Sequence, residues 1–198
     1  MTVQALTPGP VHAHGAAILR AVGINPALGI EGLATRIVPA GPTPFRGRLL
    51  HGLRLLLAAV ADRNAGQAAW ASELLLGVGP GSTPLGDDYL AASSLTVRTV
   101  GPRAGLGAGE AADLSEAILP PRARALTPAS ARMFDAVRDG RLPQRVTGIY
   151  RLEVDAGELI DLVVGIAALG ASSGRAWSAT IGATALLLEP QPNEGATH

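Results

Sequence analysis

The densest group of residues capable of chemistry lies between positions 77 and 90. This segment reads Gly-Val-Gly-Pro-Gly-Ser-Thr-Pro-Leu-Gly-Asp-Asp-Tyr-Leu, and its two adjacent carboxylates are Asp87 and Asp88. A simple connection between two helices needs a glycine and sometimes a proline, and it is usually two to eight residues long. Four glycines, two hydroxyl residues and two carboxylates in one connection therefore indicate a binding or catalytic site.

The spacing of Gly81 and Gly86 imitates the phosphate-binding P-loop of nucleotide-binding proteins. A P-loop continues with Lys and a hydroxyl residue, whereas Asp87 and Asp88 follow here. The chain contains no Lys at all, because each of its 16 Lys or Arg positions is Arg. The sequence therefore excludes a nucleotide P-loop and any chemistry that uses a lysine side chain.

The backbone amides of the glycine-rich segment are expected to form an anion-binding nest ahead of the next helix. Asp87 and Asp88 then form the predicted catalytic pair, either as Mg²⁺ ligands or as acceptors for amide or ureido N–H groups. One alternative stays open, in which the two acids only stabilise the helix N-terminus by about 0.3–1 kcal/mol each. The predicted substrate-binding residues of this segment are Gly79, Gly81, Ser82, Thr83 and Gly86.

A second candidate segment lies near the C-terminus and contains Ser172, Ser173, Gly174 and Arg175. A helix N-terminus with an arginine in its first turn would bind a carboxylate or a phosphate. The alternative is an ordinary helix–helix turn, in which Gly ends one helix and Ser caps the next. We include these four residues among the predicted substrate-binding residues.

Composition narrows the class of protein. Of the 198 residues, 47% are hydrophobic and the formal net charge is zero, which predicts a folded domain and argues against nucleic acid as a partner. The absence of Cys excludes disulfides and thiolate metal sites. The first residues lack a signal-peptide pattern, and the apolar run near 159–171 is too short to cross a bilayer. We expect a cytoplasmic protein without a membrane partner.

The elements that position these residues are expected to form an α+β fold, with a mainly helical core and a small, irregular N-terminal lobe containing short strands. The lobe covers residues 1–44. Segment 12–22 is expected to be extended or a short helix, and segment 34–39 shows the alternation of apolar and polar residues that is typical of a strand. His12 and His14 are expected to be surface histidines. Residues 45–189 form the helical domain that carries the glycine-rich segment, and 190–198 form a flexible tail. Hydrophobic periodicity and helix-ending residues predict helices near 45–64, 67–76, 85–100, 110–119, 128–139, 159–169 and 175–188, with a loop at 101–109 and a strand or extended connection within 142–152.

Three motifs resemble the AllH-type family, the subunit of oxamate carbamoyltransferase and its largely uncharacterised relatives. The family signature Gly-Leu-Gly-Pro-Gly-Leu-Thr-Pro-Ser-Gly-Asp-Asp-Phe is matched by residues 77–89, with Ser82 and Leu85 replacing Leu and Ser. A helix start at 127–130 (Thr-Pro-Ala-Ser) and the turn at 170–174 are similar to two weaker family motifs and follow in the same order. Within the third motif, Arg175 stands where family members often carry another residue.

The resemblance implies a subunit of a multi-protein enzyme that exchanges a carbamoyl group between oxalurate and phosphate, giving oxamate and carbamoyl phosphate during allantoin and purine degradation. It also implies a small anionic metabolite as ligand, with partner subunits or further copies of the chain. Two alternatives stay open. One is a non-catalytic subunit that uses the same loop to bind a partner protein, and the other is a Mg²⁺-dependent enzyme acting on a phosphorylated or carboxylated metabolite.

Overall fold

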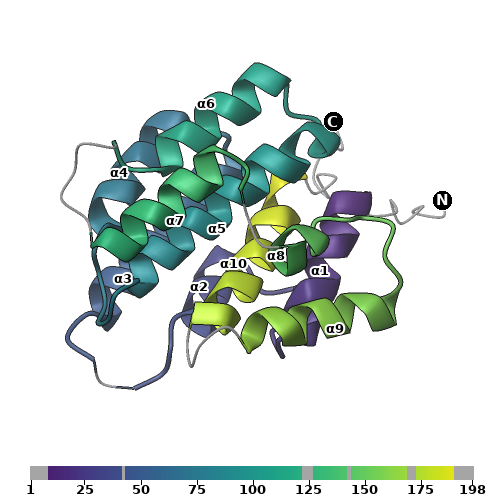
Figure 1. Cartoon of the computed structure of the whole chain (residues 1–198), viewed down its shortest axis with the longest axis horizontal. Coiled ribbons are helices and arrows are strands. Elements are labelled where there is room, and N and C mark those ends of the chain that lie inside the picture. The colour runs from purple at the N-terminus through teal and green to yellow at the C-terminus, as the bar shows by residue number, and fades with distance from the viewer. Residues whose placement is uncertain (1–8, 42, 122–126, 142–143, 169–172, 190–198) are drawn as a thin grey trace, which may run out of the picture.

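The computed structural model describes residues 9–41, 43–121, 127–141, 144–168 and 173–189, and every regular element in these ranges is a helix (Figure 1). The predicted α+β class is therefore wrong, and the described part of the chain is all-α. The elements are α1 (Pro10–Ala21), α2 (Ile30–Ile37), α3 (Arg46–Ala61), α4 (Ala65–Leu75), α5 (Leu85–Val100), the short 3₁₀ helix η1 (Gly101–Ala104), α6 (Ala108–Ile118), α7 (Pro128–Arg138), α8 (Gln144–Gly148), α9 (Ala156–Ala167) and α10 (Ser173–Leu188).

The expected strand at 34–39 is helix α2 and the residues that end it. Its buried side chains are Leu33, Ala34 and Ile37, which share one helical face at spacings of one, three and four residues. The apparent alternation arose because Thr35 and Arg36 are the exposed residues between them. Segment 12–22 likewise lies in α1 and at its C-terminal end, and the described residues of 142–152 include the short helix α8 rather than a strand.

The helices expected after residue 45 are confirmed, with boundaries that differ by a few residues. The expected loop at 101–109 contains η1 and the first turn of α6. The boundary after residue 44 stays a prediction, and helices α1 and α2 of that segment pack against α10 and α3. The predicted flexible tail, 190–198, lies outside the described residues. In the described part of the chain, no helix is long and apolar enough to cross a membrane.

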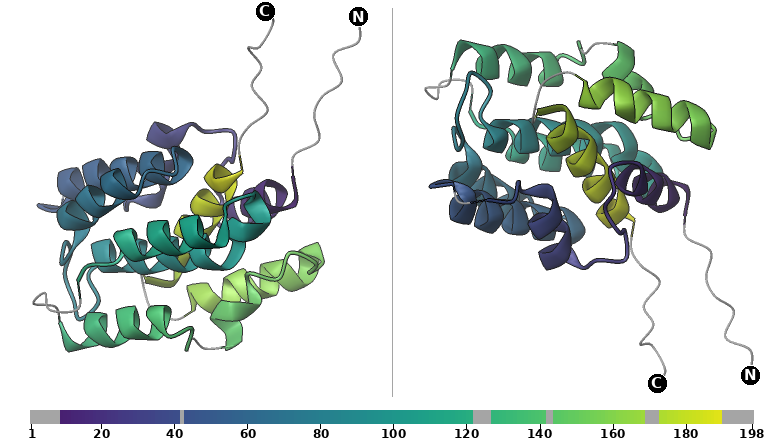
Figure 2. Two further views of the ribbon diagram at one scale, coloured as in Figure 1. Left: turned by 90° about the horizontal axis from the view of Figure 1, so that it is seen from above. Right: turned by 90° about the horizontal axis from the view of Figure 1, so that it is seen from below.

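Helix α10 lies at the centre of the fold, in contact with α1, α5, α9 and α3 (Figures 1 and 2). Every residue from 178 to 186 is buried. The contact with α1 is made backbone to backbone, since a Cβ on Gly15 would lie 2.5 Å from the Leu186 nitrogen and 2.7 Å from the Gly182 oxygen. Small residues on both helices therefore set the distance between them.

Helix α5 is the second central element, and every residue from 86 to 97 is buried. It runs parallel to α10, because Trp177 lies beside Asp88 and, further along, the Thr184 hydroxyl lies 3.1 Å from that of Ser93. The N-termini of α5 and α10 therefore lie next to each other at the same end of the fold.

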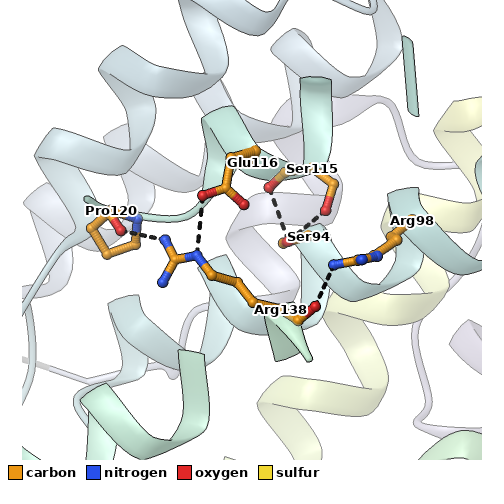
Figure 3. A network of polar contacts seen from close by, with 6 residues as sticks. All are labelled: Ser94, Arg98, Ser115, Glu116, Pro120 and Arg138. Atoms are coloured by element: carbon orange, nitrogen blue, oxygen red, sulfur yellow. Dashed lines mark hydrogen bonds and ion pairs between the residues drawn. The ribbon is translucent and has the colours of Figure 1, made fainter. Parts of the chain in front are cut away.

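Helix α7 is held beside α5 and α6 by the contacts of Arg138 (Figure 3). The buried guanidinium donates from Nε to Glu116 Oε1 at 3.1 Å and from an Nη to the Pro120 carbonyl at 2.6 Å. Arg98 of α5 donates to the Arg138 carbonyl at 2.7 Å. These bonds fix the C-terminal end of α7, whose N-terminal end reaches the glycine-rich segment.

His14 is buried, contrary to the expectation of a surface histidine. Its ring Nε2 lies 2.6 Å from the Ile149 carbonyl oxygen, so it joins α1 to the segment after α8. Burial lowers the pKa of His14, although the bond to Ile149 and the charge of Glu153 oppose this shift. His14 is therefore a buried hydrogen-bonding side chain whose uncharged form is favoured by burial.

The close approach of α1 and α10 generates the first prediction. Gly15→Ala should destabilise the protein by about 1–3 kcal/mol, because the new methyl group must push two helix backbones apart. The control is Gly165→Ala in α9, where a Cβ would meet nothing within 4 Å. There a gain of about 0.5–1 kcal/mol is expected from the better helix propensity of Ala. Urea unfolding of both variants measures the difference, and equal stabilities would contradict the packing described here.

Candidate ligand site at the N-termini of two parallel helices

The glycine-rich segment needs its glycines for backbone reasons. Gly77, Gly79 and Gly81 have φ angles of 69°, 125° and 94°, a region that other residues rarely adopt. A Cβ on Gly86 would lie 1.9 Å from the carbonyl oxygen of Leu75, so the first turn of α5 packs directly on the end of α4. The conformation of the loop thus depends on Gly79, Gly81 and Gly86, three of the residues predicted to bind substrate.

Asp87 is buried, with only 1% of its surface exposed, and both of its carboxylate oxygens are engaged. Oδ1 accepts the Gly77 amide at 2.7 Å, and Oδ2 accepts the Ser130 hydroxyl of α7 at 2.5 Å. Thr127 caps α7 by accepting the Ser130 amide, and its hydroxyl donates to the Ser82 carbonyl. Asp87 therefore fastens the start of the loop to helices α5 and α7.

Asp88 is equally buried, but its two oxygens differ. Oδ1 accepts the indole Nε1–H of Trp177 at 3.0 Å, whereas Oδ2 has no hydrogen-bond partner among the described residues. Burial raises the pKa of Asp88 to about 6, against the influence of the Ser173 and Trp177 side chains, and the charge of Asp87 adds to the rise. Ser173 therefore also acts on this carboxyl as a hydrogen-bonding side chain.

Tyr89 and Arg175 complete the neighbourhood of Asp88. Tyr89 is fully buried, and its hydroxyl has no hydrogen-bond partner among the described residues. Burial and the charge of Asp88 raise the pKa of the Tyr89 phenol, whereas Arg175 lowers it, so the three groups lie within electrostatic reach. The Arg175 side chain is exposed and donates to the Val22 carbonyl at 3.4 Å.

The structure brings the two predicted segments together at the paired ends of α5 and α10. Ser173 begins α10 and is half-buried. Gly174 is needed for packing, since a Cβ there would lie 2.0 Å from the Ile166 oxygen. Ser172 lies outside the described residues. Two site residues were missed by sequence reasoning, Tyr89 and Trp177, because buried aromatic residues on a helix usually belong to the apolar core.

The predicted loop residues lie around the start of α5. Gly81 and Ser82 are exposed, and Gly79 and Thr83 are half-buried. Within the described ranges, no group of three or more His, Asp or Glu side chains is arranged to hold a metal ion. The arrangement thus offers a buried carboxylate oxygen, a buried hydroxyl, an arginine and two helix N-termini, which together suit a ligand with both N–H groups and anionic oxygens.

A family model described as oxamate carbamoyltransferase subunit AllH matches residues 75–185, which is more than half of the chain. The chain belongs to this AllH family. The matched region starts just before the glycine-rich segment and extends into the last turn of α10, so it contains every residue of the candidate site. The resemblance seen in the three motifs is thereby confirmed. No curated protein and no solved structure matches the chain.

The two carboxylates should respond in opposite ways to the same substitution. Asp87→Asn should destabilise the protein by about 1–3 kcal/mol, because an amide cannot accept from both Gly77 and Ser130. Asp88→Asn should stabilise it at neutral pH, because the amide oxygen can still accept from Trp177 while the buried charge is removed. Chemical unfolding of both variants at about pH 7.5 measures the difference. Equal destabilisation by the two substitutions would mean that both carboxylates act only by stabilising the N-terminus of α5.

The raised pKa of Asp88 predicts a pH-dependent stability. In the native state the pKa of Asp88 is raised to about 6 from the ordinary aspartate value of 3.8. The contribution of Asp88 to the free energy of unfolding is therefore fully present below pH 3.8, where the carboxyl is protonated in both states. It falls by about 3 kcal/mol as the pH rises through 6. His14 has the opposite effect, because its lowered pKa removes stability as the pH falls below its ordinary value of 6.5.

The comparison of the native protein with Asp88→Asn isolates the carboxylate, because His14 is present in both proteins. The stability advantage of the variant should grow between about pH 4 and pH 7, as measured by urea unfolding at several pH values. An advantage that does not change with pH would contradict the buried charge at Asp88.

Proposed function

We propose that the chain is a subunit of an oxamate carbamoyltransferase and that the paired ends of α5 and α10 bind its small anionic amide or ureido ligand. The reaction is the exchange of a carbamoyl group between oxalurate and phosphate, giving oxamate and carbamoyl phosphate in allantoin and purine degradation. Membership of the AllH family supports a role as a subunit of this enzyme. The substrate and the role of each residue are our proposal.

The observation that carries the assignment of the site is that Oδ2 of Asp88 is buried and has no hydrogen-bond partner among the described residues. An unpaired buried polar group costs about 1–3 kcal/mol, and this one belongs to a side chain that is 1% exposed. Such a group is typical of a place where a ligand supplies the missing bond. An ionised carboxylate only accepts hydrogen bonds, so the ligand must present an N–H or O–H group to it.

The other groups of the site favour the anionic part of the ligand. The N-terminal amides of α5 and α10 carry partial positive charge, and the two helix ends lie side by side. Arg175 adds a full positive charge, and Ser173 adds a hydroxyl at the start of α10. In this proposal Asp88 binds the amide or ureido N–H, Arg175 and Ser173 bind the carboxylate or phosphate, and Asp87 positions the loop 79–83 beside them.

A second candidate function is a non-catalytic subunit whose loop contacts a partner chain. The observation that favours it is the exposure of Gly81, Ser82 and Arg175 on the outer side of the site. A partner chain that covers these residues would complete the site and supply the catalytic groups. The two candidates share the ligand site and differ in which chain carries out the reaction.

Calorimetric titration of the purified chain with oxamate, phosphate, carbamoyl phosphate and Mg²⁺ tests the ligand site. We expect oxamate to bind, and Asp88→Asn to weaken it about tenfold or more because a charged hydrogen bond is lost. The matched control is Asp113→Asn on the exposed face of α6, which should bind as the native chain does. Unchanged oxamate binding by Asp88→Asn would contradict the proposed site.

A turnover assay then separates the two candidate functions. If the chain alone converts oxalurate and phosphate to carbamoyl phosphate, the non-catalytic role is excluded. If it binds oxamate through Asp88 but gives turnover only with partner subunits added, the catalytic groups lie at least partly on those subunits.

A further inference from the structure

The hydroxyl of Tyr89 is the second buried polar group at the paired helix ends without a partner. The side chain is 0% exposed, and its oxygen has no hydrogen-bond partner among the described residues. The chain has two tyrosines, and the other one, Tyr150, shows the usual arrangement. Its buried hydroxyl lies 3.2 Å from the Thr96 hydroxyl. Tyr89 therefore differs from the other tyrosine of the chain. The buried hydroxyls of Ser178 and Thr180 on α10 also have no hydrogen-bond partner among the described residues.

A phenylalanine would fill the same space as Tyr89 without leaving a polar group unpaired. The hydroxyl thus carries a desolvation cost that packing alone does not require. A role of the hydroxyl in the bound state would account for its presence here.

The neighbours of the hydroxyl suggest what that role is. Asp88 precedes Tyr89 on α5, and Asp88 and Arg175 both act electrostatically on the phenol. The ionised carboxylate of Asp88 accepts hydrogen bonds and donates none, whereas the phenol of Tyr89 can donate one. A ligand that reaches both buried groups must carry an N–H donor for Asp88 and an oxygen acceptor for Tyr89, and a carboxamide or ureido group carries both.

We propose that the Tyr89 hydroxyl is a specificity-determining group, which donates a hydrogen bond to the carbonyl oxygen of the ligand while Asp88 Oδ2 accepts the adjacent N–H. This inference rests on the ligand site proposed above and adds a second contact to it. Phosphate has no amide carbonyl for the phenol to recognise, and in this proposal Arg175 and the helix ends bind its oxygens. Both groups are closed to solvent in this structure, so entry of the ligand requires the side chains that cover them to move.

The test is calorimetric titration of Tyr89→Phe with oxamate and with phosphate. We expect the affinity for oxamate to fall about tenfold, as the loss of one hydrogen bond predicts, and the affinity for phosphate to stay unchanged. The ligand-free variant should be at least as stable as the native chain, because the unpaired hydroxyl is gone. Tyr150→Phe is the matched control: it should lose stability, because the bond to Thr96 is removed, and keep its affinity for oxamate.

The outcomes separate this inference from the proposed function. If the native chain binds no oxamate, the proposed ligand fails and this inference fails with it. If the native chain binds oxamate and Tyr89→Phe binds it equally well, only the role of Tyr89 is overturned. A variant that loses affinity for oxamate and phosphate alike, or that is less stable without ligand, would assign Tyr89 a structural role.

Discussion

The close packing of α10 between α1 and α5 is the constraint on which the rest of the structure depends. Glycines at 15 and 182 let α1 and α10 touch through their backbones, and the buried length of α5 lies parallel to α10 on another side. Parallel neighbours place two positive helix ends together, an arrangement that favours negative charge in this place. The carboxylates of the first turn of α5 and the anionic ligand proposed for the site both meet that condition.

Two adjacent and chemically identical residues take different roles in this environment. Both carboxylate oxygens of Asp87 accept hydrogen bonds, one from a loop amide and one from a hydroxyl of α7. Asp88 receives the indole N–H of Trp177, has one oxygen without a hydrogen-bond partner among the described residues, and has a pKa raised to about 6 by burial. The difference follows from the 100° that separates consecutive side chains on a helix, which directs one toward α7 and the other toward α10.

The glycine-rich segment illustrates why a pattern that imitates a phosphate loop can serve another purpose. Its positive φ angles and the contact of Gly86 with the Leu75 carbonyl are needed to bring the chain from α4 into α5. The family match covers this connection together with the helices that hold it. The same turn that joins α4 and α5 therefore also places Asp88 beside α10.

The sequence by itself determined the glycine-rich segment, the carboxylate pair, most helices after residue 45, and the family. These features depend on local backbone needs and on hydrophobic periodicity within one segment. Tertiary structure decided the helical state of residues 30–37, the burial of His14, and the separate roles of Asp87, Asp88 and Tyr89. The residues that meet at these places are distant in the chain: Ser130 and Asp87 are 43 positions apart, Trp177 and Asp88 are 89, and His14 and Ile149 are 135. Side-chain roles set by such long-range contacts have no local signal, so only the packing of the helices reveals them.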